Sequence, residues 1–223
     1  MLIVCFKYPV DFRPVAEPEG TIRFAYDLRS EDESILEEPL FGQLCAWRTI
    51  LKNLNLVGQD PDRYAGLGFG NLSVRDPERA EEFVITASQT GGVRQLQQRH
   101  MTRISNCNLN RFWVDARGIQ PPSSETMTHA MIYAADPRIH WVFHCHSPDI
   151  FSRVEELALP CTEAEVTYGS PEMVTAVAEL LSNFHSRPLV FATRGHIDGI
   201  FALGPTARDT GGLTVSYLAK ALA

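Results

Sequence analysis

The sequence has few of the features that mark nucleic-acid-binding, membrane or secreted proteins. Among its 223 residues, 20 lysines and arginines stand against 27 acidic residues, and the basic residues form no run. The net charge of −7 argues against nucleic acid or an anionic membrane surface as a partner. No stretch approaches the roughly 20 apolar residues that span a bilayer. Residues 1–7 are apolar but short and lack a basic leader, so we do not interpret them as a signal peptide.

Cysteine is also sparse. The five cysteines are scattered, odd in number and form no C-x-x-C pair. This pattern argues against a disulfide framework and favours reduced thiols in a cytoplasmic protein. We expect Cys107 and Cys145 to be small buried hydrophobic residues rather than nucleophiles. The chain also has no internal repeat and no low-complexity tract.

Length and composition indicate one globular domain with an added arm. A hydrophobic content of 44% is ordinary for a globular protein. We assign residues 1–38 to an N-terminal extension, in which residues 2–8 and 21–27 carry strand-type side chains. Residues 39–223 then form the main domain.

Apolar periodicity predicts helices and short strands in the main domain. Glycine and proline mark several of the boundaries between them. Helices are expected over residues 40–54, 125–135, 147–153, 170–183 and 209–223. Strands are expected over residues 83–86, 111–117, 139–146, 189–192 and 200–203, and residues 66–75 are glycine-rich and then strand-like.

A histidine pair at the end of a predicted strand is the strongest chemical signal. Residues 139–143 are apolar and β-branched or aromatic, which predicts a buried strand. Because side chains alternate faces along a strand, His144 and His146 point one way and Cys145 points the other way. Two adjacent imidazoles are half of a site for zinc or a similar ion. The alternative is that the two histidines are only polar residues at a strand end. Ser147-Pro148 ends the strand, however, and places the pair at its carboxyl end, where functional sites collect in α/β proteins.

A third imidazole and a carboxylate come from other segments. His196 follows the pair by about fifty residues, and Glu125 precedes it by about nineteen. Three histidines leave a divalent ion with open positions for water or substrate, unlike a closed structural site. Such an ion can polarise a carbonyl, and a nearby carboxylate can transfer a proton. The alternatives are that His196 is a loop histidine and that Glu125 only complements a helix dipole. We expect His129, one helical turn after Glu125, to be a packed residue rather than a fourth ligand.

Five segments, in this order and spacing, resemble the class II aldolase/adducin family. They are GNLSVR at 70–75, ITASQTG at 85–91, SSE at 123–125, HCHSP at 144–148 and the glycines around the histidine at 195–199. The resemblance covers roughly residues 39–223. The family includes fuculose-phosphate aldolase, ribulose-phosphate 4-epimerase and methylthioribulose-phosphate dehydratase. The resemblance implies an α/β fold of three layers, α/β/α, with a central and mainly antiparallel sheet.

The resemblance also implies roles for individual residues. His144, His146 and His196 match the family's zinc ligands, with Mn²⁺, Co²⁺ or Fe²⁺ as alternative ions. Glu125 matches the carboxylate that ligates or faces the metal and acts as acid and base. Tyr217 resembles a C-terminal tyrosine that donates a proton in related aldolases. Because the family's aldolases and epimerases are four-fold tetramers, the resemblance implies a homotetramer with sites near subunit boundaries.

The predicted substrate site departs from the family pattern at one residue. Asn71, Ser88, Ser123 and Ser124 match positions that hold the substrate phosphate in the family. Gln89 stands where the family's phosphate turn usually has glycine, which permits unusual backbone angles and the close approach of an anion. We therefore expect Gln89 to narrow the pocket. A non-phosphorylated oxo acid or sugar acid is an alternative to a sugar phosphate.

Together these features predict a metal-dependent lyase of the class II aldolase type. It would cleave or form a C–C bond next to a carbonyl in a small sugar-like or oxo-acid substrate, through a metal-stabilised enediolate. A dehydratase, epimerase or decarboxylase using the same site is the enzymatic alternative. An adducin-like interaction module is the non-enzymatic alternative, although a pure scaffold has no physical need for three convergent imidazoles.

Overall fold

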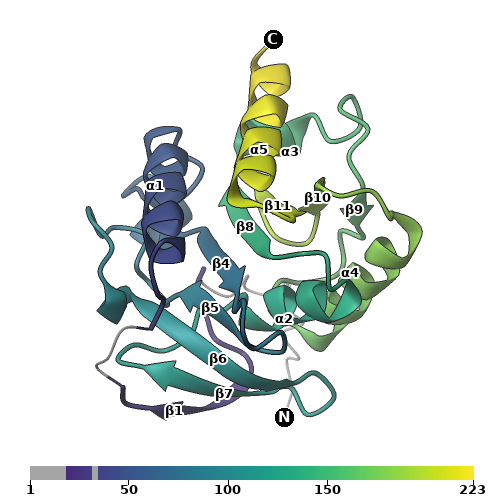
Figure 1. Ribbon diagram of the computed structural model, residues 1–223. Coiled ribbons are helices and arrows are strands. Elements are labelled where there is room, and N and C mark those ends of the chain that lie inside the picture. Colours follow the sequence, from purple (N-terminus) through teal and green to yellow (C-terminus); the bar gives the residue numbers. More distant parts are fainter. Residues whose placement is uncertain (1–18, 32–34) are drawn as a thin grey trace, which may run out of the picture.

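A computed structural model describes residues 19–31 and 35–223 of the chain. Within these residues lie a nine-stranded sheet, a separate two-stranded ladder and five α-helices (Figure 1). The helices are α1 (Leu40–Asn53), α2 (Thr126–Ala135), α3 (Pro148–Ser152), α4 (Pro171–Asn183) and α5 (Ala207–Leu222). The strands are β1 (Ala25–Arg29), β2 (Gly58–Gln59), β3 (Gly68–Phe69), β4 (Asn71–Arg75), β5 (Phe83–Thr86), β6 (Met101–Asn108), β7 (Trp113–Gly118), β8 (Trp141–His146), β9 (Cys161–Thr162), β10 (Leu189–Thr193) and β11 (Gly199–Gly204).

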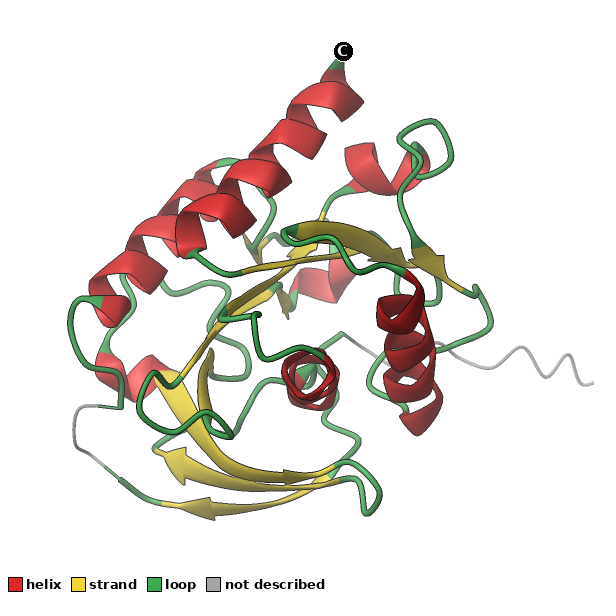
Figure 2. Cartoon of the chain, turned by 45° about the vertical axis from the view of Figure 1, so that its right-hand side comes forward, coloured by secondary structure: helices red, strands yellow, loops and turns green. Residues whose placement is uncertain are grey.

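The large sheet has the order β1-β7-β6-β5-β4-β8-β11-β10-β9. Its edge strands β1 and β9 pair in parallel with their neighbours, and the other neighbouring strands are antiparallel. Helices α2 and α4 contact each other over one face, while α5 contacts α1 and α3 over the other (Figure 2). The protein therefore has the predicted α/β architecture of three layers with a mainly antiparallel central sheet.

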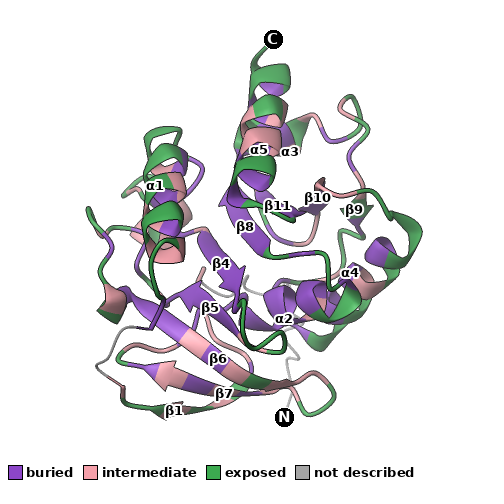
Figure 3. Ribbon diagram, viewed as in Figure 1, coloured by how far each residue is buried: buried purple, intermediate pink, exposed green. Residues whose placement is uncertain are grey.

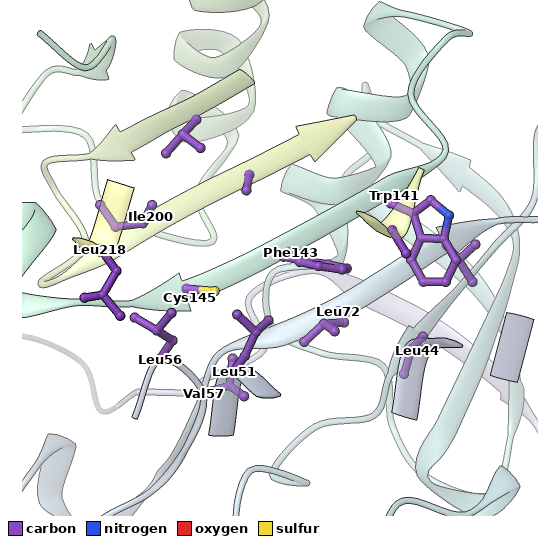
Figure 4. Close-up of a cluster of buried hydrophobic side chains, with 14 of the residues drawn as sticks. Leu44, Leu51, Leu56, Val57, Leu72, Trp141, Phe143, Cys145, Ile200 and Leu218 are labelled. Atoms are coloured by element: carbon purple, nitrogen blue, oxygen red, sulfur yellow. The ribbon is translucent and has the colours of Figure 1, made fainter. Parts of the chain in front are cut away.

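Each face of the sheet is covered by its own apolar cluster. The central strands β4, β8 and β11 between the clusters are buried along their whole length (Figure 3). The first cluster joins Leu44 and Leu51 of α1 to Leu218 of α5, as Figure 4 shows. The second cluster lies under α2 and α4 and includes Met127 and Val177. Burial of such side chains is the main favourable contribution to folding, at about 25 cal/mol per Å² of apolar surface.

Strand β8 lies between β4 and β11 and contributes to both faces. Trp141, Phe143 and Cys145 belong to the first cluster, and Val142 belongs to the second. The alternation predicted for this strand is therefore confirmed, and His144 lies on the opposite face from Cys145.

Most of the predicted helices and strands are present with boundaries shifted by a few residues. Strand β6 was not predicted, because polar side chains make up most of it and hide its alternation; they are Thr102, Arg103, Ser105, Asn106 and Asn108. Helix α5 begins at Ala207, two residues before the predicted start, because the Thr206 hydroxyl accepts a hydrogen bond from the Asp209 amide at 3.0 Å. Gly211 lies inside α5 without breaking it. A Cβ atom at this position would lie 2.3 Å from the ring of Trp47, so glycine permits the close approach of α1 and α5.

The N-terminal part of the described chain joins the sheet. Strand β1 starts at Ala25, later than the predicted strand at 21–27, and pairs along its whole length with β7. The other strand predicted for this arm, at residues 2–8, lies outside the described residues. The division of the chain at residue 38 stays a prediction. In the described part of the chain, no helix has the length and apolar character needed to cross a membrane.

Candidate active site

Three histidines meet at the carboxyl end of β8. His144 lies opposite Asn71 of β4, and His146 lies opposite Gly199 at the start of β11. His196 comes from the turn between β10 and β11, where its amide donates to the Thr193 carbonyl at 2.9 Å. All three side chains are buried, and one ligand atom from each lies within 4.8 Å of the others.

The strand holds His144 in a defined tautomer. Its Nδ1 donates to the carbonyl of Ile200 at 3.3 Å, which leaves the Nε2 lone pair directed at the site. The Nε2 atoms of His144 and His146 lie 3.1 Å apart. Burial, together with the charge of His196, lowers the pKa of both side chains well below the ordinary histidine value. Both imidazoles are therefore neutral at physiological pH, which is the form that binds metal.

Glu125 lies beside the third histidine. It is the residue before α2, is only 2% exposed and accepts a hydrogen bond from the Thr128 hydroxyl at 2.9 Å. Its other oxygen lies 3.3 Å from Nδ1 of His196 and has no hydrogen-bond partner. Burial raises the pKa of this carboxyl group, although the neighbouring His196 opposes the shift. Glu125 thus has a buried oxygen that makes no hydrogen bond and lies against the ring of His196.

A second carboxylate enters the site from the N-terminal segment. One oxygen of Glu19 lies 2.9 Å from Nε2 of His196, and the other lies 3.8 Å from Nε2 of His146. The side chain is 9% exposed. Burial alone lowers the pKa of His196, but the hydrogen bond to Glu19 and the charge of Glu125 outweigh it and raise the pKa. Glu19 was not predicted as a site residue, because it belongs to no local motif and is 177 residues from His196.

Aromatic side chains close two sides of the histidine cluster. The ring of Tyr64 meets the ring of His146 edge-on at 4.7 Å, and Tyr168 stacks on His196 at 4.5 Å. The Tyr64 hydroxyl donates to Asp198 at 2.6 Å, and its backbone is held at a φ of +50°. Such a conformation costs about 1–2 kcal/mol, so contacts with the rest of the site must sustain it. Tyr64, Tyr168 and Asp198 were not predicted from the sequence as parts of the site.

His129 lies behind the cluster and is not part of it. Its Nδ1 is 2.7 Å from the Ser73 hydroxyl, which is also 2.7 Å from the Tyr133 hydroxyl. Burial lowers the pKa of His129 to about 3. The structure therefore places His129 in a buried polar network, in keeping with its prediction as a packed residue rather than a ligand.

The five residues predicted to bind substrate line one small cavity beside the cluster. They are Asn71, Ser88, Gln89, Ser123 and Ser124. The cavity volume is about 20 Å³, enough for about one water molecule. Gln89 closes it: the backbone has a φ of +56°, and the side-chain oxygen accepts a hydrogen bond from the Gly68 amide at 3.0 Å. The side-chain oxygen of Asn71 has no hydrogen-bond partner, so an acceptor is left over in the cavity wall.

Tyr217 is not brought to the site within one chain. It lies on α5 and packs against the first apolar cluster, with the Lys220 ammonium 4.9 Å from its ring. That cluster covers the opposite face of the sheet from α2, which begins next to Glu125. A role for Tyr217 therefore requires a second copy of the chain.

The donor set of the cluster fits a divalent metal ion. Three imidazoles with converging nitrogens, and buried carboxylates beside them, are the ligands that zinc and similar ions prefer. The fold brings the Nε2 atoms of His144 and His146 to 3.1 Å from each other, and Nε2 of His196 faces Glu19 at 2.9 Å. Bringing buried imidazole nitrogens together in this way is unfavourable unless they serve a ligand.

Comparisons with known proteins identify relatives of the fold. The family model described as "Class II Aldolase and Adducin N-terminal domain" matches residues 61–217. Among solved structures, an L-fuculose 1-phosphate aldolase superposes with a TM-score of 0.63 at 19% identity, covering 85% of each chain. The L-fuculose-1-phosphate aldolase of Thermus thermophilus gives a TM-score of 0.59 at 19% identity, covering 82% of this chain and 91% of its own.

A third solved structure comes from a protein whose name leaves its activity open between aldolase, epimerase and decarboxylase. This protein, YgbL from Klebsiella pneumoniae, gives a TM-score of 0.61 at 16% identity, covering 84% of this chain and 89% of its own. At such identities the likeness extends to the fold alone. No curated protein matches the chain in sequence.

Proposed function

The chain belongs to the class II aldolase and adducin family, and we propose that it is a divalent-metal-dependent lyase. The reaction is cleavage or formation of a C–C bond next to a carbonyl in a small sugar-like or oxo-acid substrate. One observation carries the proposal: three buried imidazoles converge within 4.8 Å, with the unpaired oxygen of buried Glu125 3.3 Å from one of them. Burying these groups costs free energy that a purely structural role would not repay.

His144, His146 and His196 would hold the ion, with Zn²⁺ as the first choice. When bound, the ion supplies Lewis-acid polarisation of the substrate carbonyl. The carbonyl of Ile200 fixes the orientation of His144, and the Tyr64 ring restricts His146. The site therefore presents its ligand atoms in a prearranged geometry.

Glu125 would move the proton. A base must reach a proton on the substrate carbon or hydroxyl next to the carbonyl, and the free oxygen of Glu125 is available for this. Burial raises the pKa of the carboxyl group, which strengthens it as a base. Thr128 binds the other carboxylate oxygen and keeps the group in one orientation.

The remaining end of the substrate would bind in the cavity of Asn71, Ser88, Ser123 and Ser124. These residues offer hydroxyl and amide groups rather than a positive charge, and Gln89 occupies part of the space. This arrangement supports a substrate with a carboxylate or a neutral polar end. Because the cavity holds about one water molecule, any of these groups requires the Gln89 side chain to move, and a phosphate requires the larger movement.

The same groups support a second enzymatic interpretation. A polarised carbonyl and a buried base also suit a dehydratase, an epimerase or a decarboxylase, and the name of YgbL spans part of this range. Once a substrate is found, analysis of the products by NMR distinguishes C–C cleavage from dehydration, epimerisation and decarboxylation. An adducin-like scaffold without catalysis is the remaining alternative, and absence of metal binding in purified protein would favour it.

We further propose a homotetramer in which a neighbouring chain completes each site. Tyr217 lies on the far face of the sheet from Glu125, so it can serve a site only in another subunit. Large apolar side chains are exposed on two helices, with Ile50 of α1 42% exposed and Leu222 of α5 64% exposed. Light scattering at micromolar concentration checks the assembly, since an active monomer of 24.9 kDa would exclude shared sites.

The Glu125→Gln variant tests the proposed chemistry even before the natural substrate is identified. Purified zinc-loaded protein is incubated in D₂O with a panel of ketoses, ketose phosphates and oxo acids. NMR then follows exchange of the C–H protons next to each carbonyl. For any compound that exchanges with the wild type, Glu125→Gln should slow exchange by about 10²–10⁴-fold while metal content is unchanged.

The control for this experiment is Glu165→Gln, which removes an exposed carboxylate from the loop before Tyr168. It should exchange at the wild-type rate. Equal rates for Glu125→Gln and the wild type would contradict the assignment of the base.

A further inference from the structure

Glu19 occupies a position that the three-histidine site leaves open. His196 lies between two carboxylates, with Glu125 next to Nδ1 at 3.3 Å and Glu19 next to Nε2 at 2.9 Å. The Nε2 atoms of His144 and His146 are themselves 3.1 Å apart, and Glu19 is 3.8 Å from the second of them. Glu19 therefore lies on the side where the Nε2 atoms gather, while Glu125 lies behind the His196 ring.

The residues that follow Glu19 hold it in place. Gly20 packs so tightly on Gln89 that a Cβ atom would lie 2.1 Å from the side-chain nitrogen. The Arg23 guanidinium lies over the Tyr168 ring at 4.9 Å from its centre. Strand β1 begins shortly afterwards and pairs along its whole length with β7. The segment 20–24 thus anchors the carboxylate on the sheet.

The charge balance of the site also favours a carboxylate at this position. Three neutral imidazoles leave both charges of a divalent ion uncompensated in a buried site, which is unfavourable. Glu125 supplies one negative charge and Glu19 supplies a second. The Glu19 side chain is only 9% exposed, so its charge is poorly screened by solvent and acts strongly on whatever the histidines hold.

On the premise of the metal site proposed above, we propose that Glu19 is a fourth protein ligand of the divalent ion. It takes the position that water or a substrate oxygen would occupy in a site of three histidines. A substrate oxygen that takes this position on the ion must therefore displace the Glu19 carboxylate. Glu19 and Gly20 also line the cavity that Gln89 narrows, so the same segment borders both the ion and the cavity.

The test compares the full-length wild type with Glu19→Gln and Glu19→Ala. Each protein is loaded with Co²⁺, whose visible absorption reports the number and type of ligands, and metal affinity is measured by chelator competition. Both variants should bind Co²⁺ and Zn²⁺ about 10–100-fold more weakly, with an altered Co²⁺ spectrum. Glu179→Gln, which removes an exposed carboxylate from α4, is the matched control and should match the wild type. Circular dichroism of the metal-free proteins checks folding. If Glu19→Ala is misfolded, the comparison uses Glu19→Gln, whose side chain has nearly the same shape as that of glutamate.

Acetate provides the second measurement. In Co²⁺-loaded Glu19→Ala, added acetate should shift the spectrum toward that of the wild type and saturate, because it replaces the missing carboxylate. The wild-type spectrum should not respond at the same concentrations. Wild-type affinity and spectrum in both Glu19 variants would overturn the inference while leaving the three-histidine site intact. A wild type that binds neither ion would overturn the inference and the proposed function together.

Discussion

The two faces of strand β8 are buried to the same degree but differ in what burial does for them. On one face, Trp141, Phe143 and Cys145 pack against α1 and α5. On the other face, His144 and His146 are 1% and 0% exposed. Their imidazole nitrogens lose hydrogen bonds to water, and apolar contacts cannot replace these. Apolar burial stabilises the fold, whereas burial of an imidazole is unfavourable unless it finds a partner. The first face thus contributes stability, and the second depends on that stability to hold its ligand atoms together.

The largest expected effect is on the polar face. His144→Ala removes one of three convergent nitrogens, and we expect zinc binding to be lost in elemental analysis of protein purified without chelator. Compared with the metal-free wild type, the metal-free variant should lose about 0.5–1.5 kcal/mol in free energy of unfolding, the net contribution of a hydrogen bond such as that to Ile200. Retention of zinc at full stoichiometry would contradict the site.

The apolar face should show the opposite pattern. Phe143 is fully buried between the rings of Trp47 and Trp141, both 6.2 Å away. Phe143→Ala should lower the free energy of unfolding in urea by about 3–5 kcal/mol, since it deletes a large side chain from a packed core. The folded fraction should still bind zinc with nearly wild-type affinity. If zinc affinity falls as far as in His144→Ala, the two faces are not separable.

A pH titration tests the polar network behind the histidines. The pKa of buried His129 is about 3, well below its ordinary value of 6.5, so the folded protein keeps it neutral. Between these values the unfolded chain binds a proton that the folded chain does not, and stability therefore falls as the pH falls. From pH 7.5 to pH 5 this group alone should cost about 2 kcal/mol, at about 1.4 kcal/mol per pH unit below 6.5. Urea unfolding of metal-free wild type and His129→Gln should show that difference in pH dependence, and parallel curves would refute it.

The smallest effect concerns the rim of the site. Gln89→Gly removes the side chain that closes the cavity and suits the positive φ at this position. Inorganic phosphate should bind the variant about five- to tenfold more tightly than the wild type, a gain of about 1 kcal/mol in calorimetric titration. Gln95→Gly, a substitution at an exposed glutamine outside the cavity wall, is the comparison for nonspecific effects. Equally tight phosphate binding by the wild type would show that Gln89 does not restrict the cavity.

Sequence patterns predicted the elements whose burial is regular. Residues 141–146 alternate strictly between two environments, and α4 begins with a serine N-cap and a proline, so both could be predicted from the chain. Strand β6 could not, because its polar residues are satisfied by partners that are distant in sequence. Arg103, for example, pairs with Asp76 and donates to the Ile35 carbonyl. A register shift between Ile104 and Asn106 also interrupts its alternation.

The same limit applies to the site. His144 and His146 are two residues apart, so strand geometry alone predicts that they share a face. Glu19, Tyr64 and Tyr168 reach the histidines only through tertiary structure, and no local pattern distinguishes them from other polar or aromatic residues. The expectation that Gln89 narrows the cavity came from the resemblance to the family, whose turn usually has glycine at this position.

The alignment of β8 with its neighbours has a consequence for refolding. Asn71 and Phe201 flank His144 on the adjacent strands, and Gly199 lies opposite His146. If β8 paired with its neighbours one residue out of register, both imidazoles would face the layer of α1 and α5. The tryptophan, phenylalanine and cysteine side chains of β8 would then face the layer of α2 and α4. Only molecules with the correct alignment then bring both imidazoles to His196, and an ion that binds all three histidines shifts the population toward these molecules. A divalent cation in the refolding buffer would therefore stabilise chains with the native strand register and raise the yield of the native form.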